Sequence, residues 1–253
     1  MKYLATADTD IGITKKTNQD SLLIKHGSYE DGEILLAVVC DGMGGLAKGE
    51  VASASVITAF SNWFDNELPF ELNNPDMKII GAKWELLLKE LNTRISEYGS
   101  AIRENMGTTF TGILFVNDEY VVGHVGDSRL YKIDQDIHQL TQDHTYVARE
   151  INAGRMTLEQ ARIDPQRNML LQCVGASGKV EPQIFWGKDT PGVYMLCSDG
   201  FRHEITAREI YDAFIPQSLT DKNVMHSRAR YMIDLVKKRN EKDNISVILI
   251  RVI

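Results

Sequence analysis

The sequence is poor in cysteine and has no long apolar run. Its three cysteines are an odd number at spacings that match no metal site, which argues against a disulfide framework and for a reducing compartment. Cys40 and Cys197 stand in apolar runs, where cysteine serves as a small buried hydrophobic residue. No apolar stretch approaches membrane-spanning length, and the first ten residues, MKYLATADTD, are too polar for a signal peptide. We therefore expect a cytoplasmic protein without membrane insertion.

An excess of positive charge is also missing. The net charge is −7 and the pI is about 5.4, which argues against a protein whose main task is to bind nucleic acid. Hydrophobic residues make up 43% of the 253 residues and charged residues 25%, as in ordinary globular proteins. A chain of this length can bury a large core without disulfides.

Several common catalytic motifs are absent. A P-loop requires G-x-x-x-x-G-K-[ST], and Lys48 does not have that spacing. Cysteine-dependent phosphatases carry arginine six residues after the reactive cysteine, whereas the residues at that distance here are Leu46, Lys179 and His203. There is no paired-histidine zinc motif and no G-x-S-x-G of serine hydrolases. These absences exclude four familiar routes to hydrolysis.

Strand-like segments dominate both ends of the chain and its middle. The central block TFTGILFVNDEYVVGHVGDSRLYKI is typical of a meander, with a short hairpin loop at Asn117–Asp118 and a second tight turn at GDS. His124, inside an apolar run, is expected to be a hydrogen-bonded core residue. Antiparallel neighbours are therefore expected. The predicted strands are 2–7, 20–26, 33–40, 108–116, 119–125, 128–134, 182–187, 192–198 and 244–252.

Helices are expected in blocks between these strands. Residues 49–68, 77–105 and 221–239 carry apolar side chains at three- and four-residue spacing. A short helix after His144 and Thr145 should stop at Gly154, and a second should begin with Thr157 as N-cap and Gln160 at the capping-box position. The pattern indicates an α+β fold, a sheet-on-sheet core covered by helices, in a single domain over 1–253.

Four aspartates stand where an apolar run meets a turn. LLAVVCDG ends in Asp41, YVVGHVGDS in Asp127 and VYMLCSDG in Asp199, while Asp243 begins the final run in KDNISVILI. Any one of them alone is most simply a turn residue. If the strands share one core, however, their ends can bring several carboxylates together at one edge.

Carboxylates gathered away from bulk water repel one another and lose hydration, so they need a compensating positive charge. A set of oxygen ligands suits Mg²⁺ or Mn²⁺. Two such ions that share a carboxylate and a water can activate a hydroxide for in-line attack on a phosphoryl group. Gly42, Gly44 and Gly45 would let the main chain approach the ions, and the Gly42 carbonyl is a candidate ligand. The alternative is that GMGG is a flexible turn.

The order of these motifs resembles the metal-dependent protein phosphatase family, the type 2C Ser/Thr phosphatases, in their short bacterial form. Any one motif is weak, whereas eight in the right order are specific. They are TDIGITKKTNQDS (9–21), VVCDGMGGLAKGEVAS (38–53), MGTTFTGILF (106–115), GHVGDSRLY (123–131), LTQDHTYV (140–147), LLQCVGAS (170–177), LCSDGF (196–201) and DNISVILI (243–250).

The resemblance implies an antiparallel β-sandwich flanked by helix pairs (α-β-β-α), with a two-metal centre at one end that dephosphorylates phosphoserine and phosphothreonine in proteins. Phosphoproteins would be the partners, with a bacterial Ser/Thr kinase as the opposing enzyme, and the chain would be a monomer. By position, Asp41 would bridge two Mn²⁺ or Mg²⁺ ions, and Gly42, Asp199 and Asp243 would complete their ligands. Asp127 would bind a third ion, while Asp20 and Gln19 would act through waters. Lys15 would hold the substrate phosphate, and the segment 144–168 would be a mobile flap beside the site. Asp41, Asp199 and Lys15 are the expected catalytic residues.

Three departures from the family pattern affect these roles. Lys15 stands where the family often has arginine, with Lys16 as the alternative, and lysine lacks the bidentate fork that arginine offers to phosphate. Gln19 replaces a frequent glutamate, and Met43 stands where eukaryotic relatives have a histidine that is the candidate general acid. A module that binds phosphoproteins without turnover, or a phosphatase dedicated to one regulatory partner, therefore remain alternatives.

Overall fold

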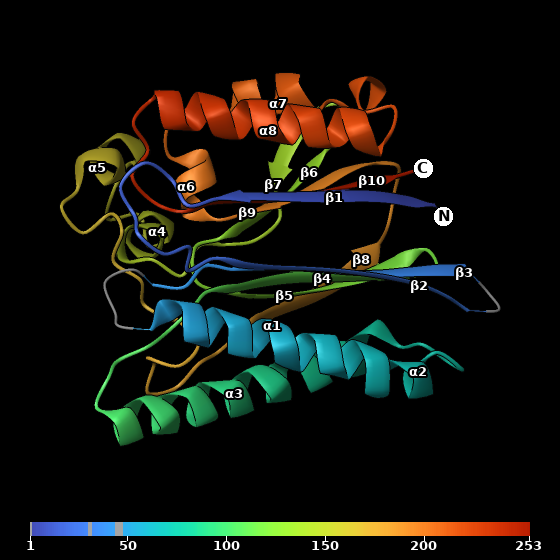
Figure 1. Ribbon diagram of the computed structural model, residues 1–253, viewed down its shortest axis with the longest axis horizontal. Coiled ribbons are helices and arrows are strands. Elements are labelled where there is room, and N and C mark those ends of the chain that lie inside the picture. The colour runs from blue at the N-terminus through green and yellow to red at the C-terminus, as the bar shows by residue number, and fades with distance from the viewer. Residues whose placement is uncertain (1, 30–31, 44–47) are drawn as a thin grey trace.

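The computed structural model describes residues 2–29, 32–43 and 48–253, which build two antiparallel sheets packed face to face (Figure 1). One sheet has the order β2 (Ser21–Tyr29), β3 (Gly32–Cys40), β4 (Phe110–Val116), β5 (Glu119–Val125), β8 (Gln183–Lys188). The other has the order β1 (Tyr3–Asp10), β10 (Ile245–Val252), β9 (Gly192–Cys197), β6 (Arg129–Ile133), β7 (Ile137–Gln139).

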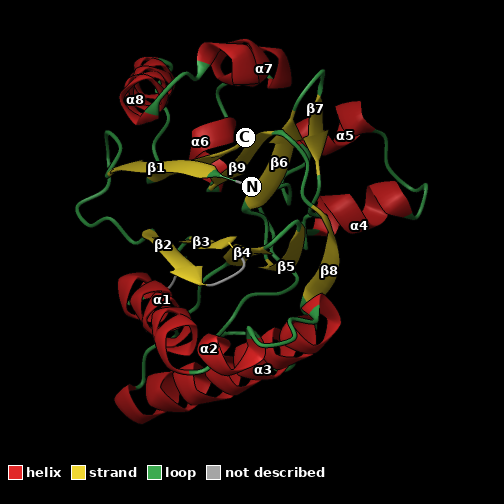
Figure 2. Ribbon diagram, turned by 90° about the vertical axis from the view of Figure 1, so that its right-hand side faces the viewer, coloured by secondary structure: helices red, strands yellow, loops and turns green. Residues whose placement is uncertain are grey.

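Helices cover the outer face of each sheet, as Figures 1 and 2 show, so the predicted α-β-β-α sandwich is confirmed. The first sheet is covered by α1 (Gly49–Asn66), α2 (Leu68–Glu71) and α3 (Met77–Ile102), and the second by α6 (Asp199–Arg202), α7 (Ala207–Phe214) and α8 (Lys222–Lys238). None of the helices in the described part of the chain combines the length and hydropathy needed to cross a bilayer.

The burial of β3 explains why its sequence is apolar without alternation. Leu36 and Val38 face α1 and α3, whereas Leu35 and Val39 face the second sheet. Successive strand residues point to opposite faces, and both faces here are covered, so both need apolar side chains. The same geometry buries Cys40 and Cys197 completely, which confirms their predicted role.

All nine predicted strands are present, but the predicted meander is wrong at its second turn. β4 and β5 form the expected hairpin at Asn117–Asp118, whereas β5 then pairs with β8, and β6 belongs to the other sheet. The chain changes sheets at Gly126, which has φ of +108°, and a β-carbon there would lie 2.6 Å from Thr109 Cγ2. GDS is therefore a crossing between layers, and it carries Asp127 to the interior.

The chain between β7 and β8 forms two short helices at one end of the sandwich (Figure 1). The hydroxyl of Thr145 caps α4 (Tyr146–Asn152), and Gly154 follows with φ of +68°. Thr157 and Gln160 form the predicted capping box of α5 (Leu158–Ile163). Strand β7 and helices α2, α6 and α7 were not predicted, and most of α2 lies in the segment 69–76 that was expected to be a loop.

Candidate metal centre

The four strand-end aspartates lie at the same end of the sandwich. β9 and β10 are antiparallel neighbours, so the end of β9 before Asp199 and the start of β10 after Asp243 meet at one edge. The pKa of Asp41 is raised well above its ordinary value by burial, and by the charges of Asp20, Asp199, Asp127 and Asp243. The structure thus brings together side chains that are up to 223 positions apart in sequence.

Asp20 is the most isolated of these acids. Both of its carboxylate oxygens are buried and have no hydrogen-bond partner among the residues that the structure describes. The pKa of Asp20 is raised to about 7, first by burial and then by the charges of Asp199 and Asp243. The nearby hydroxyls of Ser246 and Ser198 lower this pKa, although they do not reach hydrogen-bond geometry. A buried acid without partners is costly, and an ion nearby would compensate it.

The backbone beside Asp41 is held in place. The Asp41 amide donates to Thr109 Oγ1 at 2.9 Å, and its carbonyl accepts from the Thr109 amide at 2.8 Å. A β-carbon at Gly42 would lie 2.5 Å from the carbonyl oxygens of Gln19 and Gly49, so only glycine fits. The other two glycines of the motif, Gly44 and Gly45, lie outside the described residues.

Lys15 is the cation that faces the acids, whereas Lys16 is exposed. Lys15 Nζ lies 2.7 Å from Asp243 Oδ1. Burial lowers the pKa of Lys15, but its hydrogen bond to Asp243 and the charges of Asp41 and Asp199 outweigh burial, so the pKa is raised. Gln19 faces away from this group, because its Nε2 donates to Glu50 on α1 at 3.2 Å.

Asn244 fixes the loop that carries Lys15. Its Nδ2 donates to the carbonyls of Ile11 at 2.9 Å and Thr17 at 3.2 Å, and its Oδ1 accepts from the Gln19 amide at 2.9 Å. Sequence reasoning missed this role, although Asn244 directly follows Asp243 in the last motif.

Arg202 was also missed, although it follows Asp199 by only three residues. Its Nη2 donates to the carbonyl of Asp127 at 3.1 Å and lies 3.6 Å from Asp127 Oδ2. The pKa of Asp127 is raised to about 7 by burial and by the charge of Asp199, and the charge of Arg202 acts in the opposite direction. His203, the next residue, lies 3.6 Å from Asp199 Oδ2 and 3.5 Å from Glu241 Oε2.

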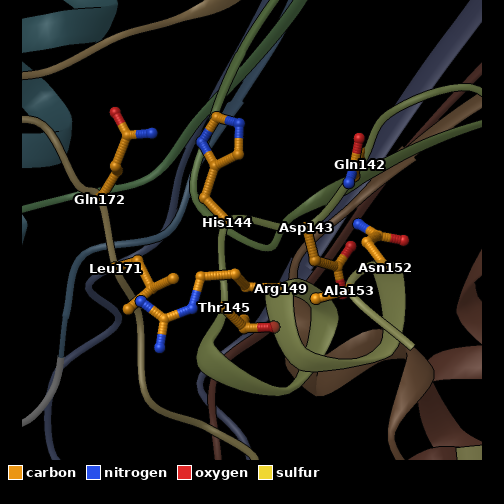
Figure 3. A pocket seen from close by; sticks show the side chains of 9 residues that line it. All are labelled: Gln142, Asp143, His144, Thr145, Arg149, Asn152, Ala153, Leu171 and Gln172. Atoms are coloured by element: carbon orange, nitrogen blue, oxygen red, sulfur yellow. The ribbon is translucent and has the colours of Figure 1, made fainter. Parts of the chain in front are cut away.

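A cavity of about 430 Å³ lies at the root of α4. Figure 3 shows the residues that line it, among them His144, Arg149 and Gln172. His144 is partly buried, and its ring lies tilted against that of His124, with 4.9 Å between the ring centroids. His124 is fully buried and hydrogen-bonded to Thr111 and Gln142, as predicted.

The donors near Asp41 are carboxylate and carbonyl oxygens, which suit a hard cation such as Mg²⁺ or Mn²⁺. Among residues 2–29, 32–43 and 48–253, no three acid, histidine or cysteine side chains already surround one point as a metal cage. By type, these donors suit oxygen-ligated ions, and the Lys15–Asp243 contact occupies one of them.

The chain belongs to the protein phosphatase 2C family, whose model matches residues 13–249. A putative protein phosphatase 2C-type of Streptococcus pyogenes is 34% identical over 247 residues, which cover 96% of this chain and 94% of that protein. The serine/threonine protein phosphatase PstP of Mycobacterium tuberculosis is 32% identical over 258 residues, which cover all of this chain but 45% of PstP. The chain thus spans about half of that relative.

Solved structures agree with this assignment. Serine/threonine phosphatase Stp1 from Staphylococcus aureus superposes with a TM-score of 0.86 at 28% identity, over 100% of this chain and 96% of that one. The catalytic domain of PstP in complex with 2 manganese ions superposes with a TM-score of 0.79 at 29% identity, over 99% and 98% of the two chains.

Proposed function

We propose that this chain is a Mn²⁺- or Mg²⁺-dependent phosphatase that acts on phosphoserine and phosphothreonine in proteins. The observation that carries the proposal is the convergence of Asp41, Asp199 and Asp243 beside the glycine backbone at Gly42. The manganese ions bound by PstP, and the phosphatase names of the relatives over this chain's full length, support it.

In this proposal Asp41, the Gly42 carbonyl, Asp199 and Asp243 are the residues that would hold the two ions. When bound, paired divalent ions supply an activated water and neutralise charge on a phosphoryl group. Asp20 contributes negative charge from behind Asp41 and acts through waters. Gln19 is bound to Glu50, so its contribution is to position the Asp20 backbone rather than to add charge.

Lys15 is the proposed phosphate contact. In the described structure its ammonium pairs with Asp243, and a substrate phosphate would take over that ammonium. Lysine offers phosphate a point charge without the paired donors of arginine, so we expect phosphate to be held less rigidly than by an arginine at this position.

The remaining assignments belong to the same proposal. The chain acts as a single cytoplasmic, monomeric domain over 1–253, and 144–168 is the flap next to the site. Its substrates are phosphorylated proteins, and a Ser/Thr kinase is the opposing enzyme. The resemblance also implies a third ion at Asp127, and no step proposed for the reaction depends on it.

Hydrolysis of a phosphothreonine peptide tests the proposal. Activity should depend on added Mn²⁺, and Asp199→Asn should lower it by about 100-fold or more, the scale on which removal of a charge-stabilising group acts. Asp212→Asn, which changes an exposed acid on α7, is the matched control and should keep full activity. Undiminished hydrolysis in excess chelator would contradict the proposal, whereas tight phosphopeptide binding without turnover would favour a binding module.

A further inference from the structure

Asp127 differs from the other site acids in having an arginine against it. The Asp127 side chain is only 9% exposed and that of Arg202 14% exposed. Arg202 Nη2 contacts both the carbonyl and the carboxylate of Asp127, at 3.1 and 3.6 Å. A divalent ion takes oxygen ligands around it, and at Asp127 a guanidinium already lies against the carboxylate.

The carboxylates of Asp127 and Asp143 already face arginine side chains. Arg202 Nη2 also lies 3.8 Å from Asp143 Oδ2. Asp143 is already paired with Arg129, whose Nε and Nη2 reach its two oxygens at 2.8 and 2.7 Å. Two arginines thus face two aspartates. Because Arg129 satisfies Asp143 in bidentate geometry, the charge of Arg202 is left for Asp127.

Arg202 is held where it is by the fold. It ends α6, which begins at Asp199, and a β-carbon at Gly200 in that helix would lie 2.2 Å from the carbonyl oxygen of Asn244 on the opposite side. Arg202 Nε is buried and finds no hydrogen-bond partner in the described part of the chain. An arginine buried at that cost is retained only where carboxylates compensate its charge, and here these are Asp127 and Asp143.

We infer that the Arg202 guanidinium takes the place of a third metal ion at Asp127, so that this chain binds two ions where its resemblance to bacterial relatives implies three. Arg202 also connects the site to Asp143, two residues before the Thr145 cap of α4. Arg202 therefore connects the acids of the site to the N-terminal end of the segment 144–168. The inference rests on the proposed two-ion site.

Manganese stoichiometry measured without substrate tests this inference. Equilibrium dialysis of the full chain against Mn²⁺, with metal analysis, should give two ions per chain for the wild type and also for Asp127→Asn. Arg202→Gln frees the Asp127 carboxylate and should gain a third ion, which the double variant with Asp127→Asn should lose again. Arg202→Lys keeps the positive charge and should remain at two.

Arg208→Gln is the matched control, because it removes an equal charge from the exposed surface of α7, where Arg208 pairs with Asp212, and leaves the Arg202–Asp127 contact in place; it should remain at two ions. A third ion in the wild type that disappears in Asp127→Asn would overturn the inference, as would folded Arg202→Gln that stays at two. If circular dichroism shows that Arg202→Gln does not fold, the comparison of wild type with Asp127→Asn decides. A count of zero in the wild type would instead overturn the two-ion site itself.

Discussion

The metal-free protein should become more stable when Asp20 is replaced by asparagine (Asp20→Asn). Burial and neighbouring carboxylates raise the pKa of Asp20 from 3.8 to about 7. Between these values the folded state holds a proton that the unfolded state releases, so the free energy of unfolding falls as pH rises through this window. Above pH 7 the whole cost is present. The interval corresponds to about 4 kcal/mol, at about 1.4 kcal/mol for each pKa unit.

Urea unfolding followed by circular dichroism, in excess chelator, measures this effect. Asp20→Asn should exceed the wild type by about 4 kcal/mol at pH 8 and by less than half of that at pH 5. Asp8→Asn is the control: this buried acid on β1 pairs with Arg230, so its loss should destabilise at both pH values. The reasoning is refuted if Asp20→Asn is no more stable than the wild type at pH 8, or if its advantage does not change with pH.

Three further changes test other parts of the structure. Burial lowers the pKa of His124 to about 3, so the unfolded state takes up a proton first as pH falls below about 6.5. Between pH 7 and 5 the free energy of unfolding of the wild type should therefore fall by about 2 kcal/mol more than that of His124→Gln, measured by guanidinium unfolding. Equal losses would contradict this. Asn244→Ala removes three hydrogen bonds to the Lys15 loop, so KM for a phosphopeptide should rise several-fold, more than kcat falls; an unchanged KM would show that Asn244 does not position Lys15. Gly42→Ala places a β-carbon 2.5 Å from two carbonyl oxygens, so Mn²⁺ should stabilise this variant against heat far less than the wild type, and an equal Tm shift would count against close backbone approach.

Much of the fold follows from local patterns in the sequence. The apolar run LLAVVC predicts a strand, and its lack of alternation is explained because both faces of β3 are buried. The Thr157–Gln160 capping box predicts the start of α5 from side-chain chemistry alone. The acids could be grouped for a similar reason. The strands of a sandwich end at one of its two ends, so the positions of Asp41, Asp199 and Asp243 at strand ends favoured the prediction that they lie close together.

Other features depend on contacts that local sequence does not encode. The turn at Gly126 has the same residue types whether the next strand pairs with β5 or crosses to the other sheet, and packing decides between them. Arg202 and Asp127 are 75 positions apart, so the sequence around either residue does not predict their contact. The choice between Lys15 and Lys16 required the direction of the side chain, which the loop and its Asn244 contacts fix.

Anomalous diffraction from crystals grown with Mn²⁺ tests the central claim most directly, because it locates ions and ligands together. We expect two peaks per chain, about 3.5–4 Å apart as in two-metal sites generally, with Asp41 between them and Asp199, Asp243 and the Gly42 carbonyl around them. Peaks elsewhere on the protein, or none near Asp41 at saturating Mn²⁺, would contradict the assignment of these carboxylates to a phosphatase metal centre.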